Sequence, residues 1–176
     1  STDGGYIVAG FSNSNDGDVT GNHGDYDYWV VKLSPLGAIE WQKSLGGIGF
    51  DRAQSIQQSA DDGYIVAGYS NSNDGDVTGN HGSADYWVVK LSPIGAIEWQ
   101  KSLGGNEEDQ AQSIQQSADG GYIVAGFSSL NDGDVTGNHG GRDYWVVKLS
   151  PAGAVEWQKS LGGSRFDMPH SIQQSR

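Results

Sequence analysis

The chain has 176 residues, a formal net charge of −12 and no cysteine. Without cysteine there are no disulfides or thiolate metal sites, and an acidic chain lacks the dense Lys and Arg that nucleic acid requires. No apolar run approaches the roughly 20 residues of a membrane helix, so membrane insertion is not expected. Abundant glycine, with Tyr, Trp, Val and Ile in short runs, indicates an all-β protein with many turns.

The sequence repeats itself with a period of 58 residues, and 43 of the 58 positions are identical in all three copies. The copies cover residues 1–58, 59–116 and 117–176. A repeat of this kind cannot bury its apolar surface alone, so we expect three equal modules that pack on one another.

Each copy predicts four strands, which we take in chain order in the second copy. Tyr64–Ser70 is mostly apolar and suits a strand that is buried on both faces. A polar loop leads to Asp85–Ser92, and a Pro-Ile-Gly turn leads to Ala96–Leu103, in which apolar and polar residues alternate. Ala111–Ser117 is short and polar. The pattern predicts a four-stranded antiparallel unit in every copy.

Repeated four-stranded units that are rich in Gly and aromatic residues are typical of the blades of a β-propeller. The polar strand suits the innermost position, and the alternating strand suits the exposed outer edge. A β-solenoid is the alternative, but its rungs are usually shorter and rarely carry two tight hairpins. The prediction is therefore an all-β propeller.

The motifs DGGYIVAG, DYWVVKLSP, GAIEWQKSLGG and SIQQSADGG, taken together, resemble the tandem β-propeller repeats of secreted and surface-exposed bacterial and archaeal proteins. The resemblance covers essentially the whole chain and implies a binding or scaffolding role outside the cell or at its surface. The near-identity of the copies indicates either recent amplification of one blade or deliberate design.

The two ends of the chain do not coincide with the ends of a blade. The first predicted strand, Tyr6–Ser12, corresponds to the second strand of a blade, and the last, Ser171–Ser175, corresponds to the first. Three blades are too few for a propeller, so we expect the ends to meet between molecules by strand exchange. The chain would then partner itself, as a homodimer with six blades or a homotrimer with nine, and six is favoured. The alternative is a segment of a longer protein.

Most of the fifteen positions that differ between copies fall in the loops that should emerge on one face of the fold. Variable loops on a rigid frame often create binding specificity, although drift at tolerant sites is the alternative explanation. The predicted ligand-binding residues on this face are Asp25, Tyr26, Phe50, Arg52, Glu107, Glu108, Arg142, Arg165 and Phe166.

The constant loop NDGDVTGNHG carries the one candidate metal chemistry of the sequence, because calcium prefers clustered hard oxygen ligands. The candidate ligands are Asp16, Asp18, Asp74, Asp76, Asp132 and Asp134. The alternative is an Asx-rich turn in which these side chains bond nearby amides. One histidine per loop is poor zinc chemistry, so we expect it to make a loop hydrogen bond.

No nucleophile elbow and no differentiated pair of carboxylates is present, so an enzyme is not expected. The leading functional hypothesis is a non-catalytic interaction or scaffold module that presents its variable face to a protein or glycan. A purely structural or engineered symmetric propeller is the first alternative. A sugar-binding lectin is the second, with Tyr26, Phe50 and Phe166 as platforms for the sugar rings.

Overall fold

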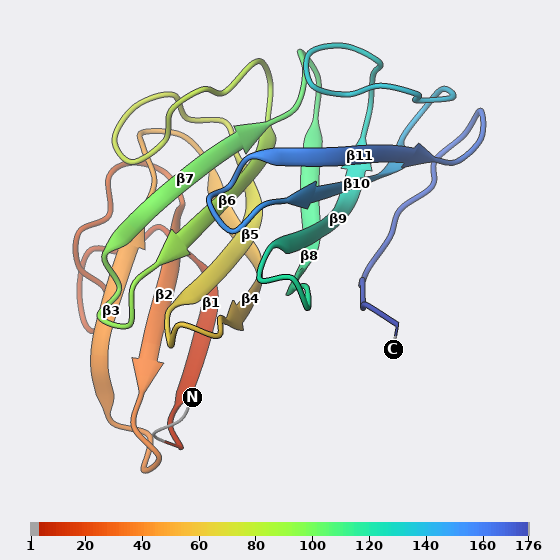
Figure 1. Cartoon of the computed structure of the whole chain (residues 1–176). Coiled ribbons are helices and arrows are strands. Elements are labelled where there is room, and N and C mark those ends of the chain that lie inside the picture. Colours follow the sequence, from red (N-terminus) through yellow and green to blue (C-terminus); the bar gives the residue numbers. More distant parts are fainter. Residues whose placement is uncertain (1–3, 176) are drawn as a thin grey trace.

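The computed structural model describes residues 4–175, and every regular element in this range is a β-strand (Figure 1). Residues 1–3 of the first repeat and Arg176 of the third lie outside the described part of the chain. The strands are β1 (Tyr6–Ser12), β2 (Asp27–Leu33), β3 (Ile39–Leu45), β4 (Asp51–Gln58), β5 (Tyr64–Ser70), β6 (Asp85–Leu91), β7 (Ile97–Leu103), β8 (Asp109–Gln116), β9 (Tyr122–Ser128), β10 (Asp143–Leu149) and β11 (Val155–Leu161).

The strands form three antiparallel sheets in which sequential strands are always neighbours. The first sheet has the order β1-β2-β3, the second β4-β5-β6-β7 and the third β8-β9-β10-β11. The predicted four-stranded unit is therefore confirmed for the second and third sheets, with the polar strand at one edge and the alternating strand at the other. β4 and β8 begin two residues earlier than predicted, because the ladder extends to the pairs Asp51–Ser70 and Asp109–Ser128.

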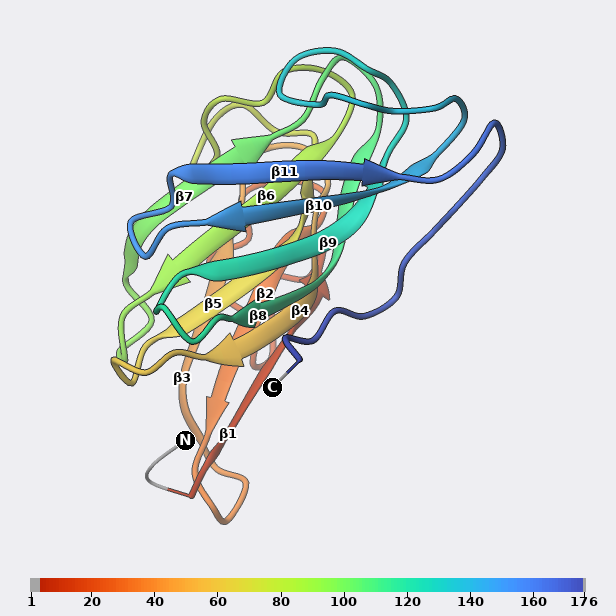
Figure 2. The same ribbon diagram turned by 45° about the vertical axis from the view of Figure 1, so that its right-hand side comes forward.

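The sheets follow one another with their faces together, and each is rotated relative to the one before it (Figures 1 and 2). The contacts between sheets run from β1 to β4 and from β5 and β4 to β8. The arrangement is open, because the first and third sheets lie at opposite ends of the series. The chain by itself therefore does not close into a ring.

Two hydrophobic clusters hold the sheets together, one at each junction. The middle strand β6 serves both, since its side chains alternate between the two faces of the second sheet. Tyr86 and Val88 belong to the cluster shared with the third sheet, and Trp87 and Val89 to the cluster shared with the first. All four are fully buried. The run DYWVVKL is apolar on both faces because each face meets another sheet.

The lysine of this run is buried in a cluster of charges at the end opposite the long loops. The Nζ atom of Lys90 lies 2.8 Å from Asp61 and 2.9 Å from Glu98. Burial by itself would lower the pKa of Lys90, but the two carboxylates outweigh it and raise that pKa. Burial by itself would raise the pKa of Asp61, but hydrogen bonds from Lys90, Ser59 and Gly63 lower it to about 2. The charge is thus retained inside the fold by direct partners.

The strand predicted over Ser171–Ser175 does not form in the single chain. Residues 162–175 follow β11 without regular structure (Figure 2). Their last part lies beside β8, because the amides of Ile172 and Gln174 donate to the side chains of Ser113 and Gln115. A β-ladder needs a partner strand, and the described part of this chain supplies none there. Residues 4–175 also contain no helix of the length and apolarity that a membrane span requires.

Each junction contains a buried hydrogen bond from one sheet to the next, which gives a direct test of sheet packing. The hydroxyl of Tyr28 donates to the carbonyl of Trp87 at 2.8 Å, and that of Tyr86 donates to the carbonyl of Trp145 at 2.8 Å. Burial raises the pKa of both tyrosines well above the usual value. These hydroxyls therefore remain protonated donors at neutral pH.

We expect Tyr86→Phe to lower the free energy of unfolding by about 1–2 kcal/mol, because it leaves the Trp145 carbonyl buried without its donor. Urea denaturation followed by tryptophan fluorescence measures this difference. Tyr69→Phe is the matched control, since the first and third copies carry Phe at the same position. Its effect should stay within about 0.5 kcal/mol. Equal losses in the two variants would contradict the role of the junction hydrogen bond.

Candidate functional site

The positions that differ between copies converge at one end of the sheets. The strand register places the loop over residues 13–26 and the connector over residues 46–50 at the same end, because Ser12 pairs with Asp27 and Tyr28 pairs with Leu45. Eleven of the fifteen variable positions lie at this end, namely 11, 13, 14, 25, 26, 48–50 and 52–54 in the first copy. We call it the variable end.

At the first junction, which lies between the first and second sheets, the predicted residues Tyr26, Phe50 and Arg52 form a cluster with Phe11. The Arg52 guanidinium lies 4.7 Å from the ring centre of Tyr26 and 4.8 Å from that of Phe11. Tyr26 stacks on Phe50 with ring centres 5.7 Å apart. Such contacts are worth about 0.5–2 kcal/mol each, depending on exposure. The Nε atom of Arg52 is buried without a hydrogen-bond partner among the described residues.

The second junction, between the second and third sheets, carries different residue types at the equivalent positions. Ala84 replaces Tyr26, Glu108 replaces Phe50 and Gln110 replaces Arg52. Loss of the large side chains leaves a cavity of about 240 Å³. Its walls are Phe50, Arg52, Tyr69, Asn71, Ser83, Ala84, Glu108 and Gln110, which combine aromatic, amide and charged groups.

The third copy again joins an arginine to aromatic rings, although the arginine comes from another position, and this cluster lies on the side of the third sheet where no further sheet follows in the described chain. Arg142 lies 4.5 Å from the ring centre of Phe127 and 5.5 Å from that of Phe166. It also forms an ion pair with Glu108 at 2.5 Å. Variable residues of the second and third copies therefore contact one another directly.

The remaining predicted residues lie at the outer tips of this end. Asp25, Glu107 and Arg165 are exposed, and none of them joins the clusters just described. The predicted residues thus share one end of the molecule, and the structure divides them into side chains that contact one another and exposed tips. Phe166 contacts Arg142 but is itself 75% exposed.

The aspartates of the constant loop reach across to the preceding connector. Asp74 Oδ1 accepts from the amide of Ile48 at 3.0 Å, and Asp76 Oδ2 accepts from that of Gly46 at 3.2 Å. Asp132 and Asp134 do the same in the third copy, to the amides of residues 106 and 104. The carbonyl of Asp16 accepts from Val19 within its own loop, and Asp18 is part of the same turn. In the second and third copies these side chains therefore join the loop of one sheet to the connector that leads into that sheet from the preceding one.

Within residues 4–175, no group of three or more His, Cys, Asp or Glu side chains has the geometry to hold a metal ion. The calcium ligands named from the sequence therefore do not converge as a set in the described residues. Calcium binding by these loops stays a prediction.

The loop histidines make the hydrogen bonds expected of them. His23 Nδ1 lies 2.6 Å from Asp27 Oδ2, and His81 Nδ1 lies 2.6 Å from Asp85 Oδ2. In both cases the same carboxylate oxygen also accepts from the backbone amide of the histidine. The histidine and the aspartate at the start of the next strand thus close the loop.

A feature that the sequence analysis missed is a pair of buried carboxylates at each junction. Asp85 and Asp109 are at most 1% exposed. Each leaves its Oδ1 atom without a hydrogen-bond partner in the described structure, as do Asp27, Asp51 and Asp143. A side-chain carbon added to Gly104 would lie 2.6 Å from Asp109 and 2.8 Å from Asp85, so only glycine fits between the two carboxylates. The sequence feature that could have revealed these carboxylates is the aspartate at positions 51, 109 and 167, which is the same in all three copies although the residues around it vary.

Burial governs the ionisation of these groups. It raises the pKa of Asp109 to about 6, with hydrogen bonds from Ser128 and the Gly105 amide opposing it and the charges of Asp85 and Asp132 adding to it. Burial likewise raises the pKa of Asp51 and of Asp85. Ionised carboxylates without a full set of donors are costly in such surroundings.

In comparisons with known proteins, no protein-family model matches the chain and no curated protein matches it. The resemblance drawn from the repeat motifs therefore stays a prediction.

We expect the protein to lose stability as the pH rises from 5 to 7. A carboxyl whose pKa is 3.8 when unfolded and about 6 when folded stabilises the protonated folded state below pH 4, and this contribution disappears as the pH rises through 6. At about 1.4 kcal/mol per pKa unit, Asp109 alone costs on the order of 3 kcal/mol at pH 7. Asp109→Asn should remove this part of the slope in urea denaturation at several pH values.

Asp61→Asn is the control for this measurement, because its pKa lies near 2 and its titration falls below the pH 5–7 window. Its slope between pH 5 and 7 should match that of the unmodified protein. An unchanged slope in Asp109→Asn would show that the buried carboxyl does not titrate in this range.

Proposed function

We propose that the three sheets are consecutive blades of a β-propeller, and that the chain is a non-catalytic interaction module. Its variable end binds a protein or glycan ligand at the junctions between blades, outside the cell or at its surface. The observation that carries the proposal is the concentration of sequence differences at one end of an otherwise repeated frame. Binding modules commonly place variable residues on such a frame.

The surface at the junctions has the composition of a binding site. The cavity at the second junction joins Phe50, Arg52 and Tyr69 on one side to Glu108 and Gln110 on the other. Arginine and aromatic side chains dominate the energetics of many interfaces, since they combine large contact area with directional polar groups. The buried Nε–H group of Arg52 is a hydrogen-bond donor that has no acceptor among the described residues.

The opposite end offers no comparable variety. Its turns keep the sequence SPxG in every copy and differ mainly at Leu36, Ile94 and Ala152. Leu36 and Ile94 are single exposed residues, at 97% and 75% exposure. Isolated apolar side chains of this kind are ordinary on a protein surface and mark no site. Sequence differences between copies are thus concentrated at one end of the sheets. This distribution favours a ligand-binding role for that end over uniform sequence drift.

The test uses substitutions that the fold already accepts in another copy. Tyr26→Ala and Arg52→Gln give the first junction the residues of the second, so the frame should tolerate both. Binding is measured against a glycan array and against immobilised proteins of bacterial cell surfaces. For a ligand bound at this junction, the dissociation constant should rise at least about tenfold in either variant.

Leu36→Ala and Ile94→Ala are the matched controls, because the third copy carries Ala at this position of the opposite end. They should bind as the unmodified chain does. Absence of binding to every probe would favour the purely structural alternative, and equal losses in the control variants would contradict a site at the variable end.

A further inference from the structure

The first and third sheets expose residues that the middle of the chain buries. Tyr6 is 61% exposed, whereas its equivalents Tyr64 and Tyr122 are 2% exposed. Val8 is 50% exposed, whereas Val66 and Val124 are fully buried. The third sheet shows the same on its outer face, where Tyr144 and Leu161 are exposed although their equivalents in the other sheets are buried. Each end sheet therefore has one apolar face that no other sheet covers in the described part of the chain.

The internal junctions show what covers such faces. In the cluster between the second and third sheets, Ile65 and Val88 pack with Tyr122, Val124 and Trp145. The equivalent positions in the other copies show which residues lie on the open faces. Ile123 and Val146 lie on that of the third sheet, and Tyr6, Val8 and Trp29 on that of the first. The two open faces are thus the two halves of one more junction.

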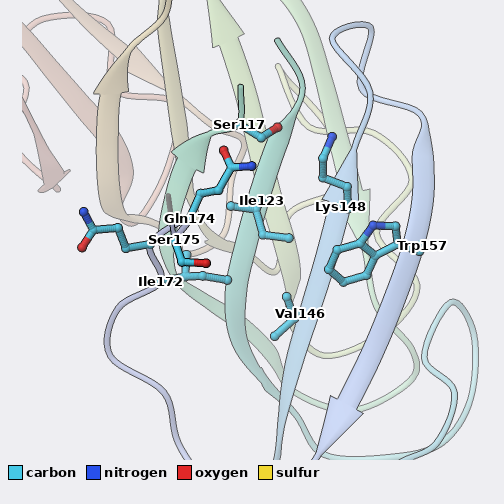
Figure 3. Close-up of a pocket in the computed structure, with 9 residues that line it drawn as sticks. Ser117, Ile123, Val146, Lys148, Trp157, Ile172, Gln174 and Ser175 are labelled. Atoms are coloured by element: carbon cyan, nitrogen blue, oxygen red, sulfur yellow. The ribbon is translucent and has the colours of Figure 1, made fainter. Parts of the chain in front are cut away.

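The open face of the third sheet is hollowed. A cavity of about 290 Å³ lies between Ile123, Val146, Lys148 and Trp157 on one side and the C-terminal segment on the other (Figure 3). Ile172 and Gln174 of this segment border the cavity, with Ile172 beside Ile123 in the view. Trp157 remains 50% exposed at the far side. This is the space that an adjoining sheet fills elsewhere in the chain.

The C-terminal segment already occupies the place of an inner strand. The amide of Ile172 donates to Ser113 Oγ at 3.2 Å, as the amide of Ile114 does to Ser55 Oγ at 3.2 Å. The amide of Gln174 donates to Gln115 Oε1 at 2.7 Å, in the manner of Gln116 on Gln57 at 2.6 Å. Residues 171–175 therefore sit on β8 as β8 sits on β4.

We propose that a second copy of this chain supplies the missing strands, with its β1 pairing alongside residues 171–175. The inference rests on the proposed propeller architecture. The register of β8 on β9 places Ile172 opposite Val8 of the partner subunit and Gln174 opposite Tyr6 of the partner subunit. Pro169 falls where the internal ladders shift register, a place at which proline is tolerated.

The other junction contacts extend across the same boundary. The hydroxyl of Tyr144 meets the carbonyl of Trp29 of the partner subunit, as Tyr28 and Tyr86 meet Trp87 and Trp145. Asp16 and Asp18 of the partner subunit face the amides of Ser164 and Gly162, as Asp74 and Asp76 face Ile48 and Gly46. The acidic loop of the first copy thereby acquires the role that it has in the other two.

The same contact joins both ends of each chain, so two chains close a ring of six sheets. A head-to-tail contact forms a closed ring when the rotation between units permits and an open filament otherwise. Propellers usually contain four to eight blades, which admits six and disfavours the nine of a trimer. Closure also gives β1 of each chain a partner strand, so that all six sheets have four strands.

The solution mass tests the proposal directly. Light scattering coupled to size-exclusion chromatography should give twice the 18.7 kDa of the chain. The measurement is made at a protein concentration of about 100 µM. A mass equal to one chain would overturn the inference, and a mass equal to three chains would overturn the ring of six sheets. Neither result bears on the ligand assay at the first junction, which lies within one chain.

Point variants separate the new contact from general stability. Val8→Glu places a charge on the exposed face of β1 and should raise the dissociation constant of the dimer at least about a hundredfold. Leu36→Glu, at a residue 97% exposed, should leave it unchanged. Equal effects, or no effect, would contradict the pairing.

The register is tested by cross-linking, since the chain has no cysteine of its own. Tyr6→Cys combined with Gln174→Cys should give a covalent dimer on a non-reducing gel, because paired strand positions are within disulfide reach. Leu36→Cys combined with Gln174→Cys is the control and should not form one. A dimer by light scattering without this cross-link would refute the proposed strand pairing.

Discussion

Packing between sheets is the interaction on which this structure depends. Each middle strand carries large apolar side chains on both faces, so a sheet is stable only when another sheet covers each of them. The second sheet meets that condition within the chain, through the clusters around Tyr86 and Val88 on one face and Trp87 and Val89 on the other. The outer faces of the first and third sheets do not, as the exposure of Tyr6, Val8 and Trp157 shows. The proposed dimer follows from this imbalance.

Polar groups fix the spacing and order of the sheets. Asp74 and Asp76 accept from amides of the connector that precedes their own sheet, and Tyr28 donates to a carbonyl of the sheet that follows. The buried carboxylates of Asp85 and Asp109 approach each other around Gly104, which explains the first glycine of the pair after every outer strand. These groups destabilise the fold when ionised, and the directional bonds around them select one register.

The variable end illustrates how differences between copies are constrained by contact. Tyr26 and Phe50 stack on each other and both lie beside Arg52, whereas the second copy carries Ala, Glu and Gln at these three places. Arg142 of the third copy pairs with Glu108 of the second. Substitutions at neighbouring positions are therefore coupled through packing, and the result is a different chemical surface at each junction. That variety on a constant frame is what the proposed recognition role requires.

The sequence by itself determined the period, the strands and the end of the molecule at which the copies differ. These are local properties, since the alternation of side chains, the turn residues and the antiparallel connections are all encoded within one repeat. The strand predicted over Ser171–Ser175 is absent from the single chain because a strand requires a partner that the sequence cannot place. Likewise, the tertiary structure alone decided that Asp109 lies buried beside Asp85 and that Arg52 lies against Phe11 and Tyr26. Burial and contact between repeats depend on how sheets stack, and residues far apart in the chain jointly set that arrangement.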